Sequence, residues 1–121
     1  MAHILIIDDD ESDRFLLGSI LEGLGHSYTE LPNGANAVNT VKECHCAVVA
    51  LDLIMPDVEG AETLQNLHRE LPGVPVVVMS GLGKEYLPMM SHLGAVAVAE
   101  KTTDFVEVVE ALKSVLSAIP A

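Results

Sequence analysis

The chain has 121 residues, half of them hydrophobic, and this length favours one domain with a substantial hydrophobic core. Its 18 acidic and 6 basic side chains give a net charge of -12, which disfavours nucleic acid and anionic membranes as direct partners because both bind Lys and Arg clusters. We see neither a signal peptide, nor a disulfide framework, nor an apolar run near the roughly 20 residues of a membrane span, so a cytoplasmic protein is expected.

Short apolar runs rich in β-branched residues alternate with segments in which apolar residues recur at helical spacing. In chain order the pattern predicts a strand at His3–Ile7, a helix at Ser12–Leu24, a strand at Ser27–Leu31, a helix at Asn33–Cys44, a strand at Cys46–Leu51, a helix at Val58–Leu71, a strand at Val74–Met79, a weak fourth helix, a strand at Val96–Ala99 and a helix from Thr103 or Asp104 to Ser117.

Local residues indicate where several of these helices begin. Ser12 or Asp13 is the expected N-cap of the first helix and Asn33 that of the second, because short polar side chains accept hydrogen bonds from free backbone N–H groups. Pro88 lies inside the weak fourth pattern, and proline is tolerated only in the first turn of a helix. That helix is therefore expected to be short and to begin near Leu87 or Pro88.

The alternation of strands and helices determines the expected fold class. It implies right-handed βαβ units and a parallel sheet, and it leaves only short loops between the elements. The predicted architecture is a flavodoxin-like, doubly wound α/β fold with a five-stranded parallel sheet in the order 2-1-3-4-5 and five helices. Residues 1–121 are predicted to form a single domain, since no linker, repeat or low-complexity segment is visible.

The most informative stretch is residues 48–60, in which an apolar run leads to Asp52 and then breaks at Pro56. This pattern fits a strand that is buried on both faces and ends near Asp52. Ligands of open α/β sheets bind beyond the carboxyl ends of the strands, and a buried carboxylate is costly unless it is paired or bonded to a metal. On position alone, the alternative interpretation is an Asp that caps a turn.

Polar residues also end the other strands that border the crevice of this sheet. Asp8 and Asp9 end the first strand, Ser80 ends the fourth, and Lys101 follows the fifth. In the order 2-1-3-4-5 the second strand is an edge, and the end of that strand carries no charge. We therefore expect these polar side chains to gather at one edge of the sheet, around Asp52.

The chemistry of these side chains points to phosphoryl transfer. Three carboxylates in one crevice repel one another unless a cation is present, and Mg²⁺ prefers oxygen ligands. Phosphoryl transfer depends mostly on positioning and charge stabilisation, and a carboxylate can act as its nucleophile. The residues predict an aspartyl phosphate on Asp52, Mg²⁺ bound near Asp8 and Asp9, a positive charge from Lys101, and a hydrogen bond from Ser80 to a phosphoryl oxygen.

Four motifs together resemble the receiver domain of two-component response regulators. The resemblance covers nearly the whole chain in the family's order. The motifs are Ile6-Ile7-Asp8-Asp9-Asp10, Leu51-Asp52-Leu53-Ile54-Met55-Pro56, Val77-Val78-Met79-Ser80-Gly81, and Gly94-Ala95 followed by Lys101.

The resemblance implies a phosphoacceptor at Asp52. It also implies Mg²⁺ ligation by Asp9, Asp52 and the backbone carbonyl of Ile54, with Asp8 acting through water. Ser80 would take the role of the switch hydroxyl, and Lys101 that of the family's lysine. The implied partners are a sensor histidine kinase or a histidine phosphotransfer protein, with a downstream protein target or effector domain. Catalysis would be confined to the domain's own phosphorylation and dephosphorylation, so the protein is not expected to be an enzyme.

Departures from the family leave a second hypothesis open. Val98 stands where the family often has Tyr or Phe, and Thr102 stands where it usually has Pro, so a trans peptide bond before Thr102 or a shifted loop is expected. With Pro88, these departures favour a pseudo-receiver that binds partners without phosphorylation. A third class, a haloacid-dehalogenase-type phosphatase, would need a second Asp where Ile54 stands.

Two other features are interpreted as structural. The Cys44-His45-Cys46 cluster lacks further soft ligands at a spacing that would complete a tetrahedral metal site, so buried or half-buried cysteines at a strand start are expected. Arg14 and Arg69 are expected to be solvated charges on helices.

Overall fold

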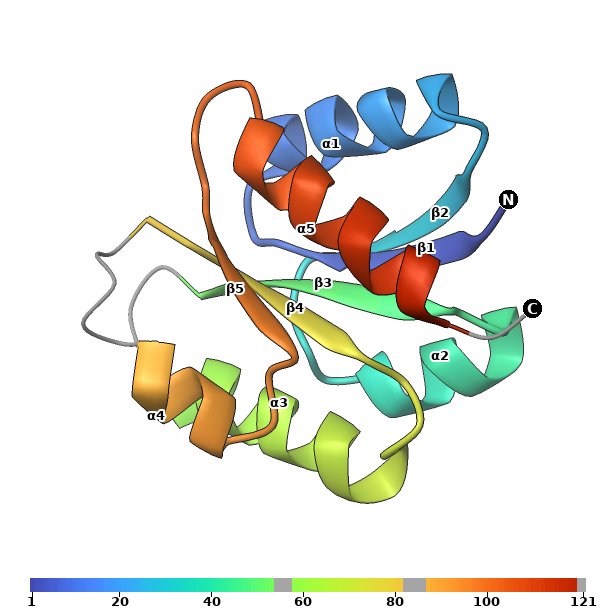
Figure 1. Cartoon of the computed structure of the whole chain (residues 1–121). Coiled ribbons are helices and arrows are strands. Elements are labelled where there is room, and N and C mark those ends of the chain that lie inside the picture. Colours follow the sequence, from blue (N-terminus) through green and yellow to red (C-terminus); the bar gives the residue numbers. More distant parts are fainter. Residues whose placement is uncertain (54–57, 82–86, 120–121) are drawn as a thin grey trace.

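The computed structural model describes residues 1–53, 58–81 and 87–119, which form a parallel sheet and its connecting helices (Figure 1). The strands lie in the order β2-β1-β3-β4-β5, as expected from the sequence. The elements are β1 (His3–Ile7), α1 (Glu11–Gly23), β2 (Ser27–Leu31), α2 (Ala37–Cys44), β3 (Val48–Leu53), α3 (Val58–Glu70), β4 (Val76–Ser80), α4 (Leu87–His92), β5 (Ala97–Glu100) and α5 (Val106–Ala118).

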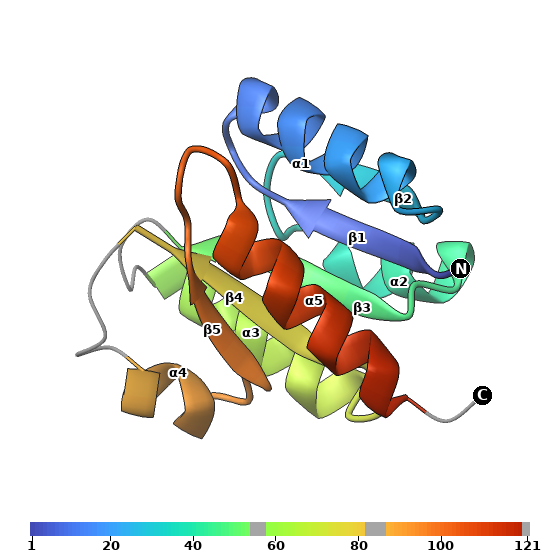
Figure 2. The ribbon, with the colours of Figure 1, turned by 45° about the horizontal axis from the view of Figure 1, so that its top comes forward.

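The sheet is a middle layer with helices on both faces (Figures 1 and 2). Helices α1 and α5 cover one face, and α2, α3 and α4 cover the other. Successive side chains of a strand point to opposite faces, so each strand contributes to both cores. In β1, Ile4 and Ile6 pack beneath α1 and α5, whereas Leu5 and Ile7 pack against α2 and α3. The core is largely aliphatic and uses Phe105 beneath α1 and α5.

The register of the sheet places Asp8 and Asp52 side by side. Ile7 pairs with Leu51, so the residues that follow each of them lie at neighbouring positions where β1 and β3 leave the core. The backbone N–H of Asp8 still donates to the carbonyl of Leu31 at 3.1 Å, which holds this end of β1 against β2. Because Asp52 is two residues beyond Ala50, its side chain lies on the same face as α1 and α5.

The predicted starts of three helices are wrong by a few residues. Helix α1 is capped by Asp10, whose carboxylate accepts from the N–H of Asp13 at 3.0 Å, so neither Ser12 nor Asp13 is the N-cap. Asn33 accepts from the N–H of Ala35 at 3.0 Å, and this short turn precedes α2 rather than capping it. In each case a polar side chain accepts a hydrogen bond from a nearby backbone N–H. The residue at which the helix starts depends on how the chain packs in the folded protein.

Helix α5 begins at Val106, later than Thr103 or Asp104. The Asp104 carboxylate accepts from the N–H of Val106 at 3.2 Å and from the Thr102 hydroxyl at 2.8 Å, so the polar residues before the helix form a turn. Phe105 then takes a left-handed conformation with φ of 57°, which directs its ring into the core. Burial of this ring therefore shifts the helix start past the polar residues.

Strands β3, β4 and β5 lie one or two residues later than the apolar runs predicted. Cys46 and Val74 begin those runs and pack against the core without joining the ladder. The carbonyl of Pro75 already accepts from Val49 at 3.0 Å, but proline has no N–H to donate. Hydrophobic burial and strand pairing therefore begin at different residues.

Two expectations about the unusual segments are confirmed. Helix α4 is short and starts at Leu87, with Pro88 in its first turn. The residues that the structure describes contain no cis peptide bond, so the bond between Lys101 and Thr102 is trans.

Among the described helices, none is both long and apolar enough to traverse a bilayer.

The two cysteines lie in different environments and are both free. Cys44 is exposed at the end of α2, and Cys46 is buried two residues later, with His45 in a left-handed turn between them. Burial raises the pKa of the Cys46 thiol to about 11. The opposite exposure of the two thiols agrees with a structural role for Cys46.

A soluble alkylating reagent is expected to modify Cys44 on the order of a hundredfold faster than Cys46 near neutral pH, because Cys44 is exposed whereas Cys46 is buried and its thiol pKa is raised. Peptide mapping after timed alkylation of the native protein measures the two rates separately. The unfolded protein in urea is the control, in which both thiols should react alike. Equal rates in the native protein would contradict this placement.

Candidate metal centre

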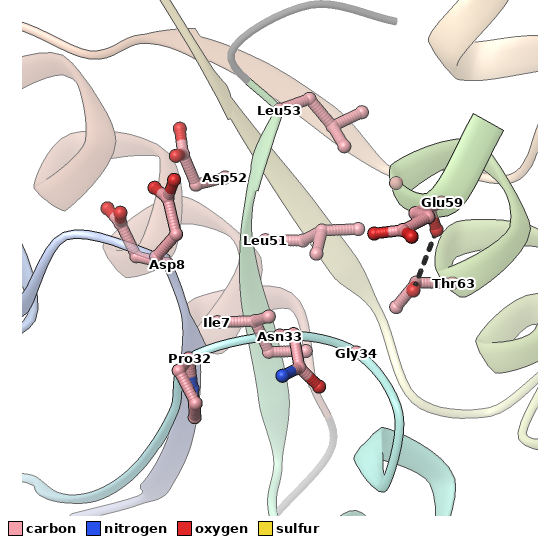
Figure 3. Close-up of a pocket in the computed structure, with 12 residues that line it drawn as sticks. Ile7, Asp8, Pro32, Asn33, Gly34, Leu51, Asp52, Leu53, Glu59 and Thr63 are labelled. Atoms are coloured by element: carbon pink, nitrogen blue, oxygen red, sulfur yellow. Dashed lines mark hydrogen bonds between the residues drawn. The ribbon is translucent and has the colours of Figure 1, made fainter. Parts of the chain in front are cut away.

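Three aspartates meet where β1 and β3 end. Asp8, Asp9 and Asp52 each offer a carboxylate oxygen, and these oxygens all lie within 4.8 Å of one another. Asp8 and Asp52 come from neighbouring strands, and Figure 3 shows their side chains on the same side of the sheet. Asp9 is the exposed member of the group. The three residues that the sequence singled out are therefore close enough to share one small cation.

Lys101 lies beside this cluster, and its ammonium group contacts three carboxylates. Its Nζ is 2.8 Å from Oδ2 of Asp8, 3.3 Å from Oδ2 of Asp52 and 2.8 Å from Oδ2 of Asp13. The backbone N–H of Lys101 donates to the carbonyl of Ser80 at 2.8 Å, which anchors the start of the β5–α5 loop to the end of β4. The lysine side chain is 15% exposed, so these contacts are only partly screened by water.

The charges at this site perturb both Asp52 and Lys101. Burial, and then the charge of Asp8, raise the pKa of Asp52 to about 6, although Lys101 opposes the shift. Burial lowers the pKa of Lys101, but its hydrogen bonds to Asp13 and Asp8 outweigh that effect and raise the pKa above its ordinary value. The ammonium group is therefore firmly charged, whereas burial and the neighbouring charge of Asp8 disfavour the ionised form of Asp52.

One buried oxygen at the site has no partner within the part of the chain that the structure describes. Among the described residues, none forms a hydrogen bond with Oδ1 of Asp52, although this atom is shielded from water. A buried acceptor without a partner is costly, and two further carboxylates lie beside it. A donor set made only of oxygens fits a hard cation such as Mg²⁺ and does not fit a soft metal. Asp8, Asp9 and Asp52 are the side chains that would hold it.

The acidic cluster borders a hollow of about 210 Å³ that runs towards α3 and the β2–α2 loop (Figure 3). Asn33 and Gly34 form one wall, and Glu59 and Thr63 of α3 form another. A side chain at Gly34 would collide with Thr63, since a Cβ built there lies 2.0 Å from the Thr63 hydroxyl. The site therefore opens onto space that solvent or a small anion can enter.

The remaining predicted site residues are placed as follows. Ser80 is buried at the end of β4 and pairs in register with Leu53, while Asp52 pairs with Met79 one position earlier. Ser80 therefore lies on β4, the strand next to β3, which carries Asp52. Ile54 lies outside the described residues. The roles assigned to Ser80, Ile54 and Lys101 from the sequence stay predictions.

Sequence reasoning missed two residues that surround this cluster. Arg14 was expected to be solvated, but it is half-buried, and its Nη1 donates to the backbone carbonyl of Asp8 at 2.7 Å while its Nε donates to Glu30 at 2.8 Å. The expectation for Arg69 holds, since its guanidinium is largely exposed. Asp13 was considered only as a helix cap, yet it contacts Lys101.

The signal for both missed residues lies in the first turn of α1. Asp13 and Arg14 follow Asp8 by five and six residues. Because α1 begins soon after β1 ends, its first turn places these two residues near the end of β1. That signal is usable only when the start of the helix is known, because a shift of one residue rotates the side chains by about 100°.

Comparisons with known proteins show which family the chain is similar to. The family model of the response regulator receiver domain matches residues 4–113. The chain is 30% identical over 87 residues to the protein PilH of Pseudomonas aeruginosa. That alignment covers 70% of the chain and 72% of PilH. It is 34% identical over 91 residues to the autoinducer 1 sensor kinase/phosphatase LuxN of Vibrio campbellii, covering 74% of the chain but only 11% of LuxN.

The fold has solved counterparts. The response regulator TrrA of Thermotoga maritima, whose crystal structure is a complex with Mg²⁺ and BeF, superposes with a TM-score of 0.82. The alignment covers 95% of this chain and 99% of TrrA at 23% identity. At that identity the likeness establishes the shared fold, including the parallel sheet order and its helices.

Proposed function

The chain belongs to the response regulator receiver domain family, and from this premise we propose that it accepts a phosphoryl group on Asp52 in a two-component signalling pathway. The observation that carries the proposal is the buried Oδ1 of Asp52, which has no hydrogen-bond partner among the described residues and lies beside Asp8, Asp9 and Lys101. Receiver domains are signalling modules rather than turnover enzymes, so phosphorylation would act as a signal.

The chemical step uses the carboxylate of Asp52 as nucleophile. A carboxylate oxygen attacks the phosphorus of a phosphohistidine, the new O–P bond forms as the P–N bond breaks, and the imidazole leaves with the electron pair and takes up a proton. Lys101 would neutralise a phosphoryl oxygen, and the Ser80 hydroxyl would donate to another. Asp9 and Asp52, with Asp8 acting through water, would hold Mg²⁺, whose charge would stabilise the reacting oxygens.

The partners follow from this chemistry. The donor is proposed to be a sensor histidine kinase or a histidine phosphotransfer protein, and the output a downstream protein target or effector domain. The matched relatives include both a sensor kinase/phosphatase and a protein of about the same length as this chain.

Phosphorylation is expected to depend on Asp52 and on a divalent cation. Incubation with Mg²⁺ and acetyl phosphate should add one phosphoryl group to the wild-type chain, as seen by intact mass. Asp52→Asn keeps the shape of the side chain but removes the nucleophilic carboxylate, so it should gain none, and EDTA should abolish labelling of the wild type. Equal labelling of both proteins would remove Asp52 from the proposed role.

The pseudo-receiver is the second candidate function. Val98, in the position where the family often carries an aromatic residue, packs against the core beneath α2, α3 and α4. A β-branched side chain has few rotamers and would not swing as an aromatic ring can. The labelling experiment separates the two candidates, because a pseudo-receiver would stay unmodified at any Mg²⁺ concentration.

A further inference from the structure

Asp13 is a fourth carboxylate at the site and comes from a helix rather than a strand end. Its Oδ2 lies 2.8 Å from Nζ of Lys101, as close as Asp8 and closer than Asp52 at 3.3 Å. Asp13 is not one of the three residues whose oxygens could share a cation. Its contact with the site is therefore made through the lysine.

The first turn of α1 holds Asp13 in this position. The N–H of Asp13 donates to the side chain of Asp10 at 3.0 Å, and the N–H of Arg14 donates to the backbone carbonyl of Asp10 at 3.1 Å. Arg14 in turn binds the backbone carbonyl of Asp8 at 2.7 Å. These contacts tie the start of α1 to the end of β1, so Asp13 faces Lys101 as a consequence of the fold.

The charge of the site changes when Asp13 is included. The three clustered aspartates and Lys101 carry a net charge of -2 when ionised, which a divalent cation would neutralise. With Asp13 the net charge is -3, so one negative charge remains beside a bound cation. A phosphoryl group brings more negative charge, and its oxygens must compete with Asp13 for the ammonium of Lys101.

Resting on the proposed function, we infer that Asp13 is a positioning residue that occupies Lys101 before phosphorylation and gives it up to a phosphoryl oxygen afterwards. Asp13 is the lysine's partner that can move, because its side chain is 33% exposed, whereas those of Asp8 and Asp52 are 1% and 3% exposed. Water can solvate the released carboxylate of Asp13 at little cost.

This role has two effects of opposite sign. A carboxylate near the cation site strengthens cation binding, so Asp13→Asn is expected to weaken Mg²⁺ binding by about twofold to fivefold, as for a partly exposed ion pair. The same change leaves Lys101 free for an oxyanion, so beryllofluoride binding and acetyl phosphate labelling at saturating Mg²⁺ should improve by about the same factor. A purely structural role would move both quantities in the same direction or neither.

Four proteins make the test specific. Calorimetric titration with Mg²⁺, followed by beryllofluoride at saturating Mg²⁺, compares the wild type with Asp13→Asn, Asp13→Glu and Glu11→Gln. Glu11 is the matched control, since it is an exposed acidic residue of the same helical turn. We expect Glu11→Gln to leave both affinities near those of the wild type, and Asp13→Glu to restore them because it keeps the carboxylate. Thermal unfolding confirms that each variant is folded.

The outcomes separate this inference from the proposed function. Failure of the wild type to bind beryllofluoride or to take up a phosphoryl group would defeat the proposed function. If the wild type does both and Asp13→Asn matches it, or if both affinities fall together, the inference about Asp13 alone is wrong. Glu11→Gln reproducing the effect of Asp13→Asn would likewise overturn it, since general charge would then explain the result.

Discussion

Lys101→Met is expected to lower the free energy of unfolding by about 2–4 kcal/mol in metal-free buffer, because it leaves buried carboxylates without their counter-charge. Lys101 contacts Asp8, Asp13 and Asp52, and the first and last of these are almost fully shielded from water. Methionine keeps the length and packing of the stem, so the change isolates the charge. Urea unfolding followed by circular dichroism at about pH 8, which is above the pKa of Asp52 of about 6, measures the effect.

Mg²⁺ should return much of that stability, since a cation that binds only the folded protein stabilises it by mass action. The matched control is Lys113→Met on α5, whose ammonium is half exposed and 3.7 Å from Glu110. Exposed ion pairs of this kind contribute little to stability, so Lys113→Met should leave the free energy of unfolding nearly unchanged. Equal losses for the two lysine variants would show that the charge cluster around Lys101 does not contribute as described.

Truncation of Phe105 is expected to have the largest effect on the core. Phe105→Ala should lower the free energy of unfolding by about 3–5 kcal/mol, which is a large part of the stability of a typical domain. The ring is 1% exposed and lies among apolar residues beneath α1 and α5. The backbone of Phe105 forms the N-cap position of α5. Its removal leaves a cavity where two helices meet the sheet.

The chain's other phenylalanine offers a matched control. Phe15 on α1 is 69% exposed, so Phe15→Ala removes the same atoms without opening a cavity and should change stability by less than about 0.5 kcal/mol. If Phe105→Ala is too unstable to purify, Phe105→Leu should show a smaller loss of the same sign. Urea unfolding of the three variants is the measurement, and similar losses for Phe15→Ala and Phe105→Ala would contradict the described core.

The fold class could be predicted because it depends on patterns that are local in the sequence. The runs His3–Ile7 and Ser27–Leu31 match β1 and β2 residue for residue. The first is a short apolar run that ends at the polar Asp8, a pattern with few alternatives to a buried strand. The sheet order was taken from the flavodoxin-like class that the alternation indicates, and the structure confirms it. The later strands were less exact because burial begins before backbone pairing does, as at Cys46 and Val74.

The convergence of acidic residues was also predictable from the sequence. Parallel strands deliver their carboxyl ends to one edge of the sheet, so Asp8, Asp9 and Asp52 had to come close once the order was known. No knowledge of side-chain packing was needed for that step. Lys101 could be assigned to the same edge by the same reasoning, and its contacts agree with it.

By itself, the sequence determined the alternation of strands and helices, the aliphatic core and the edge at which charged residues gather, because each depends on residue type and spacing. Only the tertiary structure decided that Asp13 contacts Lys101 and that Arg14 braces the end of β1. Those contacts join residues that are distant along the chain or depend on the start of α1, and the docking of that helix on the sheet sets its rotation. Side-chain pairing across elements is therefore a property of packing that local patterns do not contain.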